Sequence, residues 1–280
     1  MGNINQRPLL RSPQSLFAEN RASSSPVAAP TSVPPTQTGQ AAQPQTAPGA
    51  AEANTVSALT GGASASSLNF VHTPRLGPDD RVLHIGDSHT VGIYGQEMDK
   101  HLRSTGAKVA TYGSAGSSPK WWITGHTTRS GFFSKDGDEK TTRPAKWSDP
   151  HPTPKLETLL AQFRPNVVVF SLGANLIHAA PATIESQMRE IADMAKAYGT
   201  EIIWVGPPDG RESKKPTSKQ DTLYRTLERV AREYGDFIDS RPLTEYPATG
   251  GDGVHYGGPE GSRIAKGWAE DVFEQIQGLK

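Results

Sequence analysis

Four residues of the types used in acyl-transfer chemistry occur at predicted turns of this 280-residue chain: Ser88, Asn175, Asp252 and His255. A serine hydroxyl becomes a useful nucleophile only when a neighbouring base takes its proton. A histidine can take that proton and return it to a leaving alcohol. A carboxylate three residues earlier can reach the far imidazole nitrogen and hold its tautomer. The set predicts Ser88 as nucleophile, His255 as base and Asp252 as orienting acid.

Each of these residues also has an ordinary structural role. Ser88 could simply cap the helix that follows it, and Asn175 could satisfy only its own loop. His255 lies in a glycine-rich segment of the kind found in surface turns. We assign Asp87, beside the serine, to turn support, because its carboxylate can accept backbone N–H groups. The chemical prediction therefore depends on the whole set and not on one residue.

Hydrophobic patterning indicates the elements that must position this set. Short apolar runs predict strands, and apolar residues at helical spacing predict helices between them. The helix that begins at Thr217 is expected to open on a capping box formed by Thr217 and Gln220. Regular alternation of this kind predicts an α/β domain, a three-layer α/β/α fold with a flavodoxin-like parallel sheet of about five strands. The predicted strands are Arg81–Ile85, Lys108–Tyr112, Val167–Leu172, Glu201–Val205 and Asp236–Asp239.

The carboxyl ends of parallel strands meet at one edge of a sheet, and ligands bind there. Residues 86–88, 112–119, 173–175 and 206–210 follow the first four strands, and residues 252–255 come some way after the fifth. Four of these five segments carry residue types that acyl transfer needs. We expect one site at this edge of the sheet.

Composition divides the chain into two parts. Residues 1–74 are rich in Pro, Ala and Ser with few charges, so we predict a disordered N-terminal tail. Residues 75–280 are long enough for one catalytic domain. The formal net charge is zero, which argues against nucleic acid or an anionic membrane as the main partner. The absence of cysteine excludes disulfides, thiolate metal sites and a cysteine nucleophile, and no apolar run is long enough for an integral membrane segment.

The tail leaves two interpretations of localisation open. Its start has no basic-then-apolar signal peptide. It resembles the leaders of bacterial effectors, which are secreted by a route that needs no signal peptide. The other interpretation is a plain linker or leader on a cytoplasmic protein.

The segments around the four residues resemble the SGNH (GDSL-type) hydrolases, whose Ser, Gly, Asn and His lie in four blocks in that order. Ser88 lies in Ile-Gly-Asp-Ser-His-Thr-Val-Gly, Asn175 in Leu-Gly-Ala-Asn, and Asp252 with His255 forms the final Asp-x-x-His. The match covers most of residues 80–275. It implies a serine hydrolase that acts on carboxylic ester bonds without a cofactor.

The resemblance also implies an oxyanion hole. Its donors would be the backbone N–H groups of Ser88 and Gly116 and the side-chain amide of Asn175. Gly116 fits the family's second block best, although Gly113 is close enough to compete. Loss of one such donor typically costs about 3 kcal/mol in the transition state.

Two positions depart from the family's common pattern. His89 stands where the commonest first block has Leu, and Leu176 stands where Asp often follows the family's Asn. Neither position is usually catalytic, so the departures bear on the subfamily more than on the activity.

The connection between the second strand and a helix near Lys155 is about forty residues long, and connections of this length are typically functional or disordered. It holds Trp121-Trp122 and Phe132-Phe133, whose rings suit stacking on sugars or packing onto the domain; for the two phenylalanines we favour packing. With His89, Trp121 and Trp122 are candidate substrate contacts.

The combination of Gly-Asp-Ser-His with Gly-Ser-Ser-Pro-x-Trp-Trp is more similar to the bacterial carbohydrate-directed branch of the family than to its lipases. That branch removes O-acetyl groups from cell-wall or polysaccharide sugars, so the expected partner is an O-acetylated carbohydrate or another small ester. A lipid esterase or thioesterase is the alternative enzyme. The alternative outside enzymes is a secreted effector or binding module with an incidental site, and acyl transfer also stays open beside hydrolysis.

Metal and nucleotide sites are not indicated by the sequence. The eight histidines are scattered, without the spacing of a ligand pair. Neither a G-x-G-x-x-G nor a G-K-[ST] element is present. We expect no metal and no cofactor.

Overall fold

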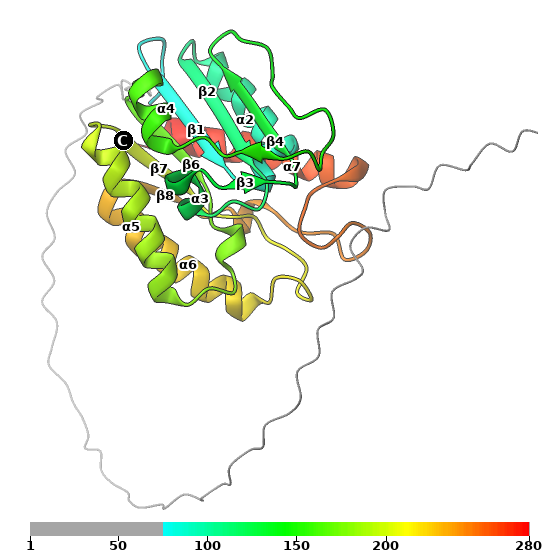
Figure 1. Ribbon diagram of the computed structural model, residues 1–280. Coiled ribbons are helices and arrows are strands. Elements are labelled where there is room, and N and C mark those ends of the chain that lie inside the picture. The colour runs from blue at the N-terminus through cyan, green and yellow to red at the C-terminus, as the bar shows by residue number, and fades with distance from the viewer. Residues whose placement is uncertain (1–74, 280) are drawn as a thin grey trace, which may run out of the picture. The chain divides into compact units, whose positions relative to one another are not determined.

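The structure is a computed structural model, and it describes residues 75–279 (Figure 1). The predicted disordered tail, residues 1–74, lies outside the described residues. The described part of the chain belongs to one compact unit, in which strands and helices alternate from β1 (Arg81–Gly86) to α7 (Gly258–Gly278).

Six strands form the main sheet in the order β4-β2-β1-β6-β7-β8. Five are parallel and correspond to the five predicted strands: β1, β2 (Lys108–Ser114), β6 (Val167–Ser171), β7 (Glu201–Val205) and β8 (Asp236–Ile238). Counted along the chain, they stand in the flavodoxin-like order 2-1-3-4-5. The predicted three-layer fold is therefore confirmed.

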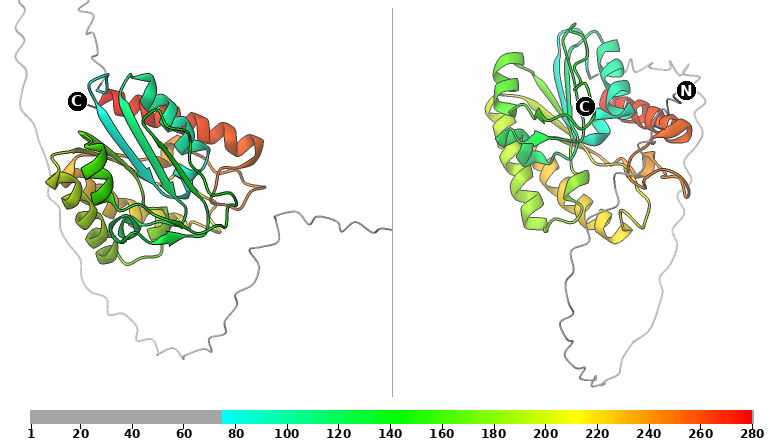
Figure 2. Two further views of the ribbon diagram at one scale, coloured as in Figure 1. Left: turned by 45° about the horizontal axis from the view of Figure 1, so that its top comes forward. Right: turned by 45° about the vertical axis from the view of Figure 1, so that its right-hand side comes forward.

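Helices cover both faces of this sheet, as the two views of Figure 2 show. One face carries α2 (Ile93–Ser104) packed against α7, and the other carries α5 (Pro181–Ala197) between α4 (Leu156–Phe163) and α6 (Thr217–Tyr234). None of the helices in the described residues is long and apolar enough to cross a membrane.

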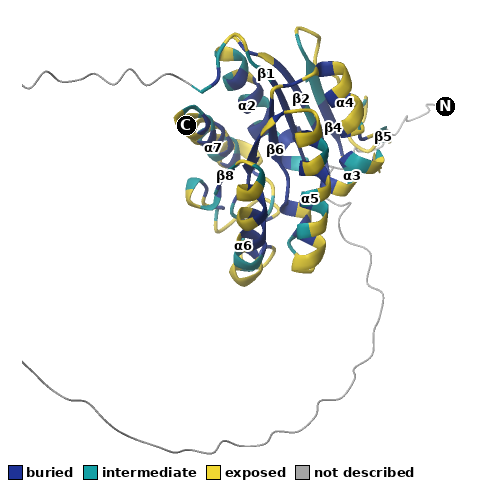
Figure 3. Ribbon diagram, turned by 90° about the vertical axis from the view of Figure 1, so that its left-hand side faces the viewer, coloured by how far each residue is buried: buried dark blue, intermediate teal, exposed yellow. Residues whose placement is uncertain are grey.

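The side chains of each strand alternate between two cores, because successive residues of a strand point to opposite faces. In β1, Leu83 and Ile85 join the core under α4, α5 and α6, whereas Val82 joins the core under α2 and α7. Full burial of one such side chain contributes roughly 1.5–3 kcal/mol. Figure 3 shows the buried strands between helices whose outer faces are exposed.

The long connection after β2 has structure of its own. It contains α3 (Pro119–Thr124), β3 (Thr127–Thr128), β4 (Phe132–Asp136) and β5 (His151–Pro152). β4 adds to the sheet antiparallel to β2, and β3 pairs with β5. β4 was not predicted, because its Phe-Phe-Ser-Lys-Asp run lacks clear alternation. The buried rings of Phe132 and Phe133 confirm that they pack onto the domain.

The predicted capping box at the start of α6 is wrong. Thr217 makes no cap with its own side chain; instead the Glu212 carboxylate accepts from its backbone N–H at 2.9 Å and from its hydroxyl at 2.6 Å. Gln220 donates to the Lys215 carbonyl oxygen at 2.9 Å rather than reaching back to the cap. Pro216 precedes the helix, so a carboxylate from the preceding loop supplies the acceptor.

Candidate active site

Ser88 lies directly after β1, at the carboxyl edge of the sheet. It is the first residue of α1 (Ser88–Val91), a single turn that ends at the extended Gly92 before α2 begins. The strands on either side of β1 are β2 and β6, which makes this the point where strand order reverses. Ligands of doubly wound sheets bind at that point.

Asp87 holds the turn that presents Ser88. Its buried carboxylate accepts the backbone N–H of His89 at 3.0 Å. Burial raises the pKa of Asp87 to about 6, and that hydrogen bond with the charges of Lys215 and His255 opposes the rise. The contact confirms that Asp87 supports the turn.

The chain brings Asp252, His255 and Ser88 together although they lie far apart in the sequence. His255 Nε2 lies 2.9 Å from Ser88 Oγ, and His255 Nδ1 lies 2.6 Å from Asp252 Oδ2. The second distance is short, as is usual for hydrogen bonds to a charged oxygen. One imidazole thus bridges a hydroxyl and a carboxylate in the order that proton transfer from the hydroxyl requires.

Asp252 also shapes the segment that carries His255. Its Oδ1 accepts the backbone N–H groups of Val254 at 2.8 Å and His255 at 2.7 Å. Partial burial would raise the pKa of Asp252, but the hydrogen bonds from His255 and Val254 outweigh it and lower the pKa to about 2. The carboxylate therefore stays ionised through the neutral pH range.

The two other predicted donors lie in turns that are tied to the Ser88 turn. Asn175 is in η2 (Ala174–Leu176), after β6, and its amide donates one hydrogen to the Ser117 carbonyl oxygen at 2.9 Å. The Ser117 hydroxyl in turn donates to the carbonyl oxygen of Gly86 at 3.4 Å. An amide nitrogen has two hydrogens, so Asn175 keeps one free for another acceptor.

Gly113 and Gly116 have different structural roles. Gly113 is buried within β2, where a Cβ atom would lie 2.7 Å from the Val91 backbone nitrogen, so it allows α1 to pack closely. Gly116 is exposed in the turn after β2 with a φ of +83°, a conformation that favours glycine. Of the two glycines considered as backbone oxyanion donors, only Gly116 lies in the turn that Asn175 contacts.

Comparison with solved structures identifies the fold that holds this arrangement. TesA superposes with a TM-score of 0.51 at 18% identity, over 71% of this chain and 99% of that chain. A catalytic mutant of Axe2, an acetylxylan esterase from Geobacillus stearothermophilus, superposes with a TM-score of 0.50 at 19% identity, over 73% of this chain and 97% of that chain. This chain has the SGNH hydrolase fold. No protein-family model matches the sequence, and no curated protein is significantly similar to it.

The three candidate substrate contacts differ in how this SGNH fold places them. Trp122 is fully buried, with its indole N–H donating to Ser117 Oγ at 3.1 Å, so its candidacy is wrong: a core ring cannot stack on a sugar. Trp121 is half-buried beside His126, and its ring lies over Gly116. It can therefore reach a ligand held at Gly116.

His89 is buried next to His255, the candidate base. Its ring centroid is 5.5 Å from that of His255 and 5.7 Å from that of Trp268, and its Nε2 has no hydrogen-bond partner. Its pKa lies well below the usual value, mainly because the ring is buried and to a smaller extent because the charges of Lys215 and His255 repel a proton. His89 is thus a neutral imidazole that lines a cavity of about 40 Å³ next to Ser88.

Two residues that support the site were not predicted. The Tyr246 hydroxyl bonds to the segment between Asp252 and His255. Lys215 is buried and donates to the Pro208 carbonyl oxygen at 3.5 Å; burial lowers the pKa of Lys215, while the charges of Asp87 and two other aspartates act against the change. Neither residue lies in a recognisable motif, so the sequence carried no signal for them.

The described residues contain no group of three or more His, Asp or Glu side chains that could hold a metal ion. The side chains linked to Ser88 by hydrogen bonds are the imidazole of His255 and, through it, the carboxylate of Asp252. This set can carry out nucleophilic attack and proton transfer with side chains alone.

Proposed function

We propose that this protein is a serine esterase that removes acetyl groups from an O-acetylated glycan through a Ser88 acyl-enzyme. The observation that carries the proposal is the continuous pair of hydrogen-bond contacts in which His255 Nε2 faces the Ser88 hydroxyl and His255 Nδ1 faces the Asp252 carboxylate. The SGNH fold of the chain supports it, since esterases with that fold are known from solved structures.

In the proposed reaction, His255 Nε2 takes the Ser88 proton as Oγ attacks the ester carbonyl carbon. The N–H groups of Ser88 and Gly116 and the free amide hydrogen of Asn175 stabilise the tetrahedral oxyanion. His255 then gives the proton to the leaving alcohol oxygen as the ester C–O bond breaks. Water, deprotonated by the same imidazole, releases acetate and restores the Ser88 hydroxyl.

Three observations favour a short acyl group on a sugar. The cavity beside Ser88 measures about 40 Å³, whereas one water needs roughly 10–15 Å³, so it accommodates only a few atoms. Axe2, which has the same fold, is an acetylxylan esterase. Trp121 beside Gly116 offers a partly exposed indole near the expected oxyanion.

Acetate release from p-nitrophenyl acetate and from acetylated xylan by the full 280-residue protein tests the proposal. We expect Ser88→Ala to lower kcat/KM at least about a thousandfold while the melting temperature stays close to that of the wild type. Labelling of wild-type protein by a fluorophosphonate, and not of Ser88→Ala, would locate the nucleophile. Wild-type protein that neither hydrolyses these esters nor reacts with the fluorophosphonate would refute the proposal.

A series of p-nitrophenyl esters with increasing acyl length separates acetylesterase from lipid esterase. We expect kcat/KM to be highest for acetate and to fall by about tenfold or more at octanoate, because the cavity beside Ser88 is small. A rise with chain length would move the assignment to a lipid esterase or thioesterase.

A further inference from the structure

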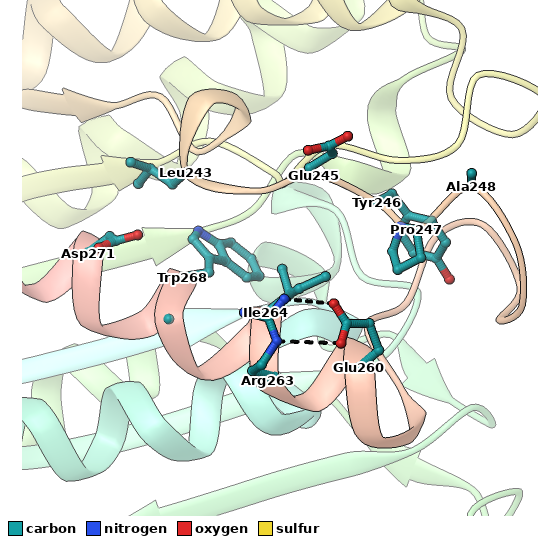
Figure 4. A pocket seen from close by; sticks show the side chains of 11 residues that line it. Leu243, Glu245, Tyr246, Pro247, Ala248, Glu260, Arg263, Ile264, Trp268 and Asp271 are labelled. Carbon is teal, nitrogen blue, oxygen red and sulfur yellow. Dashed lines mark hydrogen bonds and ion pairs between the residues drawn. The ribbon is translucent and has the colours of Figure 1, made fainter.

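A cavity of about 420 Å³ lies between the segment 243–248 and one face of α7 (Figure 4). Glu245 stands on the segment side, and Glu260, Arg263 and Asp271 stand on the helix side. Gly267 forms part of the floor, and a Cβ atom there would meet nothing within 4 Å. The space in front of Gly267 is therefore open, because a glycine has no side chain to fill it.

A second cavity shares part of its lining with this one and part with the candidate active site. It measures about 370 Å³, shares Tyr246, Pro247 and Glu260 with the first, and includes His255 in its lining. Both volumes fall within the roughly 300–1,000 Å³ of ordinary ligand pockets. We call the two cavities together the α7 groove.

The α7 groove lies on the leaving-group side of the proposed reaction. The imidazole that protonates the leaving alcohol must be next to that alcohol. The oxyanion donors Gly116 and Asn175 belong to turns after β2 and β6, and neither lines either cavity. An alcohol next to His255 can therefore extend into the groove, while the acyl carbonyl faces the other turns.

The charges of the groove restrict what this alcohol can be. Glu260 is paired with Arg263 at 2.7 Å, whereas neither Glu245 nor Asp271 makes an ion pair within the described residues. Two uncompensated carboxylates repel an anionic ligand and tolerate a neutral or cationic one.

The groove also borders a polar donor that has no partner. Trp268 is buried, and its indole N–H has no hydrogen-bond acceptor. Figure 4 shows the nitrogen side of this indole directed toward the part of the cavity where Leu243 and Asp271 lie. A ligand rich in hydroxyl oxygens is the kind of partner that such a donor lacks.

We propose that the α7 groove binds the alcohol half of the ester, and that this alcohol is a saccharide without acid groups. The inference rests on the proposed esterase function and adds the place and charge class of the glycan. The groove extends from His255 along the first turns of α7, which rise about 1.5 Å per residue, so residues 258–267 span about 14 Å.

The first test fills the groove without touching the triad. Gly267→Leu projects a side chain into open space and replaces a helical glycine with a better helix former. We expect the ratio of kcat/KM on acetylated xylo-oligosaccharides to kcat/KM on p-nitrophenyl acetate to fall at least tenfold. Gly278→Leu, at the other end of the same helix and also with open space around its Cβ, is the matched control and should leave the ratio unchanged.

The second test removes the uncompensated charges. The double variant Glu245→Gln with Asp271→Asn should raise kcat/KM on acetylated oligogalacturonates, which are anionic, relative to acetylated xylo-oligosaccharides by at least fivefold at low ionic strength. The matched control is Glu270→Gln with Glu274→Gln, two exposed positions of α7 that do not line the groove.

The outcomes separate this inference from the proposed function. Wild-type protein inactive on p-nitrophenyl acetate would refute the esterase itself. Wild-type protein active on that ester but inactive on both oligosaccharides, or more active on the anionic one, would overturn the groove inference alone. A Gly267→Leu ratio equal to that of Gly278→Leu would overturn it as well.

Discussion

The hydroxyl group of Tyr246 donates to the carbonyl oxygen of His255 at 3.0 Å. The Tyr246 hydroxyl oxygen itself accepts the backbone N–H of Gly253 at 3.0 Å, so one phenol links both halves of the Asp252–His255 segment. The guanidinium of Arg211 lies 5.3 Å from the centre of the Tyr246 ring, and the Arg211 backbone N–H donates to the Gly253 carbonyl oxygen at 2.9 Å. The exposed Asp252 and His255 are therefore supported by a buried ring.

Tyr246→Phe should act on catalysis through this support. Removal of the hydroxyl leaves the Gly253 N–H and the His255 carbonyl without their partner, which costs about 2 kcal/mol and lowers the melting temperature by roughly 4–8 °C. We expect kcat to fall about tenfold, because His255 loses part of its support. KM should stay within twofold, because the phenol is not one of the groups that bind or react with the substrate. Tyr198→Phe, at an exposed tyrosine, is the control. An unchanged kcat in Tyr246→Phe would show that the segment keeps its geometry without the phenol.

Asn175→Ala should lower kcat by about 10²–10³ with little change in KM, because an oxyanion donor acts mainly in the transition state. The variant also loses the hydrogen bond to Ser117. Asn175→Asp keeps the size of the side chain but has no hydrogen for either acceptor, so kcat should fall as it does in Asn175→Ala. The melting temperature of both variants reports the lost bond to Ser117 separately from kcat. His178→Ala, an exposed position two residues beyond η2, is the control. Comparable kcat values for Asn175→Ala and His178→Ala would contradict an oxyanion role.

The sequence was sufficient to predict the five parallel strands because each is a short apolar run, and buried parallel strands are continuously hydrophobic. Once those strands were placed, the carboxyl-edge rule brought Ser88, Asn175 and His255 to one edge. The structure indeed places Ser88 and His255 within hydrogen-bond distance. Local patterns and one topological rule thus account for the centre of the site.

Features that depend on tertiary contacts were not predictable in the same way. Both Trp121 and Trp122 looked available to a ligand, but the direction of α3 buries one ring and leaves the other half-exposed. β4 forms because the edge of β2 is free to pair, which no local pattern reveals. Tyr246 bonds to His255 and shares a core cluster with Trp268 of α7, and neither contact is visible in a local pattern of the sequence.

His89→Leu should stabilise the protein. The Nε2 atom of His89 is buried without a hydrogen-bond partner, and such an atom costs about 1–3 kcal/mol that an apolar side chain of similar size avoids. We expect the free energy of unfolding in urea at pH 7.5 to rise by about 1 kcal/mol. The kinetic readout is KM for p-nitrophenyl acetate. A tenfold rise in KM without any gain in stability would instead mean that the imidazole contacts the substrate.

His84 links the stability of the fold to pH. It lies in the middle of β1, fully buried, with Nε2 3.0 Å from Ser171 Oγ and Nδ1 without a partner. Burial lowers the pKa of His84 to about 4, although the charge of Asp99 acts in the opposite direction. Between pH 6.5 and about 4 the unfolded chain therefore binds a proton that the folded chain refuses, so stability falls as the pH falls through this window.

His84→Leu should remove this part of the pH dependence. A difference of about 2.5 pKa units corresponds to about 3 kcal/mol, so the variant should gain up to that amount relative to the wild type as the pH goes from 7 to 4. The free energy of unfolding of the wild type is subtracted from that of the variant at each pH. This difference cancels the contribution of other titrating groups such as Asp87, whose raised pKa makes stability rise as the pH falls through nearly the same window. The exposed His178, changed to Leu, is the control. Parallel stability curves for His84→Leu and wild type between pH 7 and 4 would mean that His84 is protonated in the folded protein.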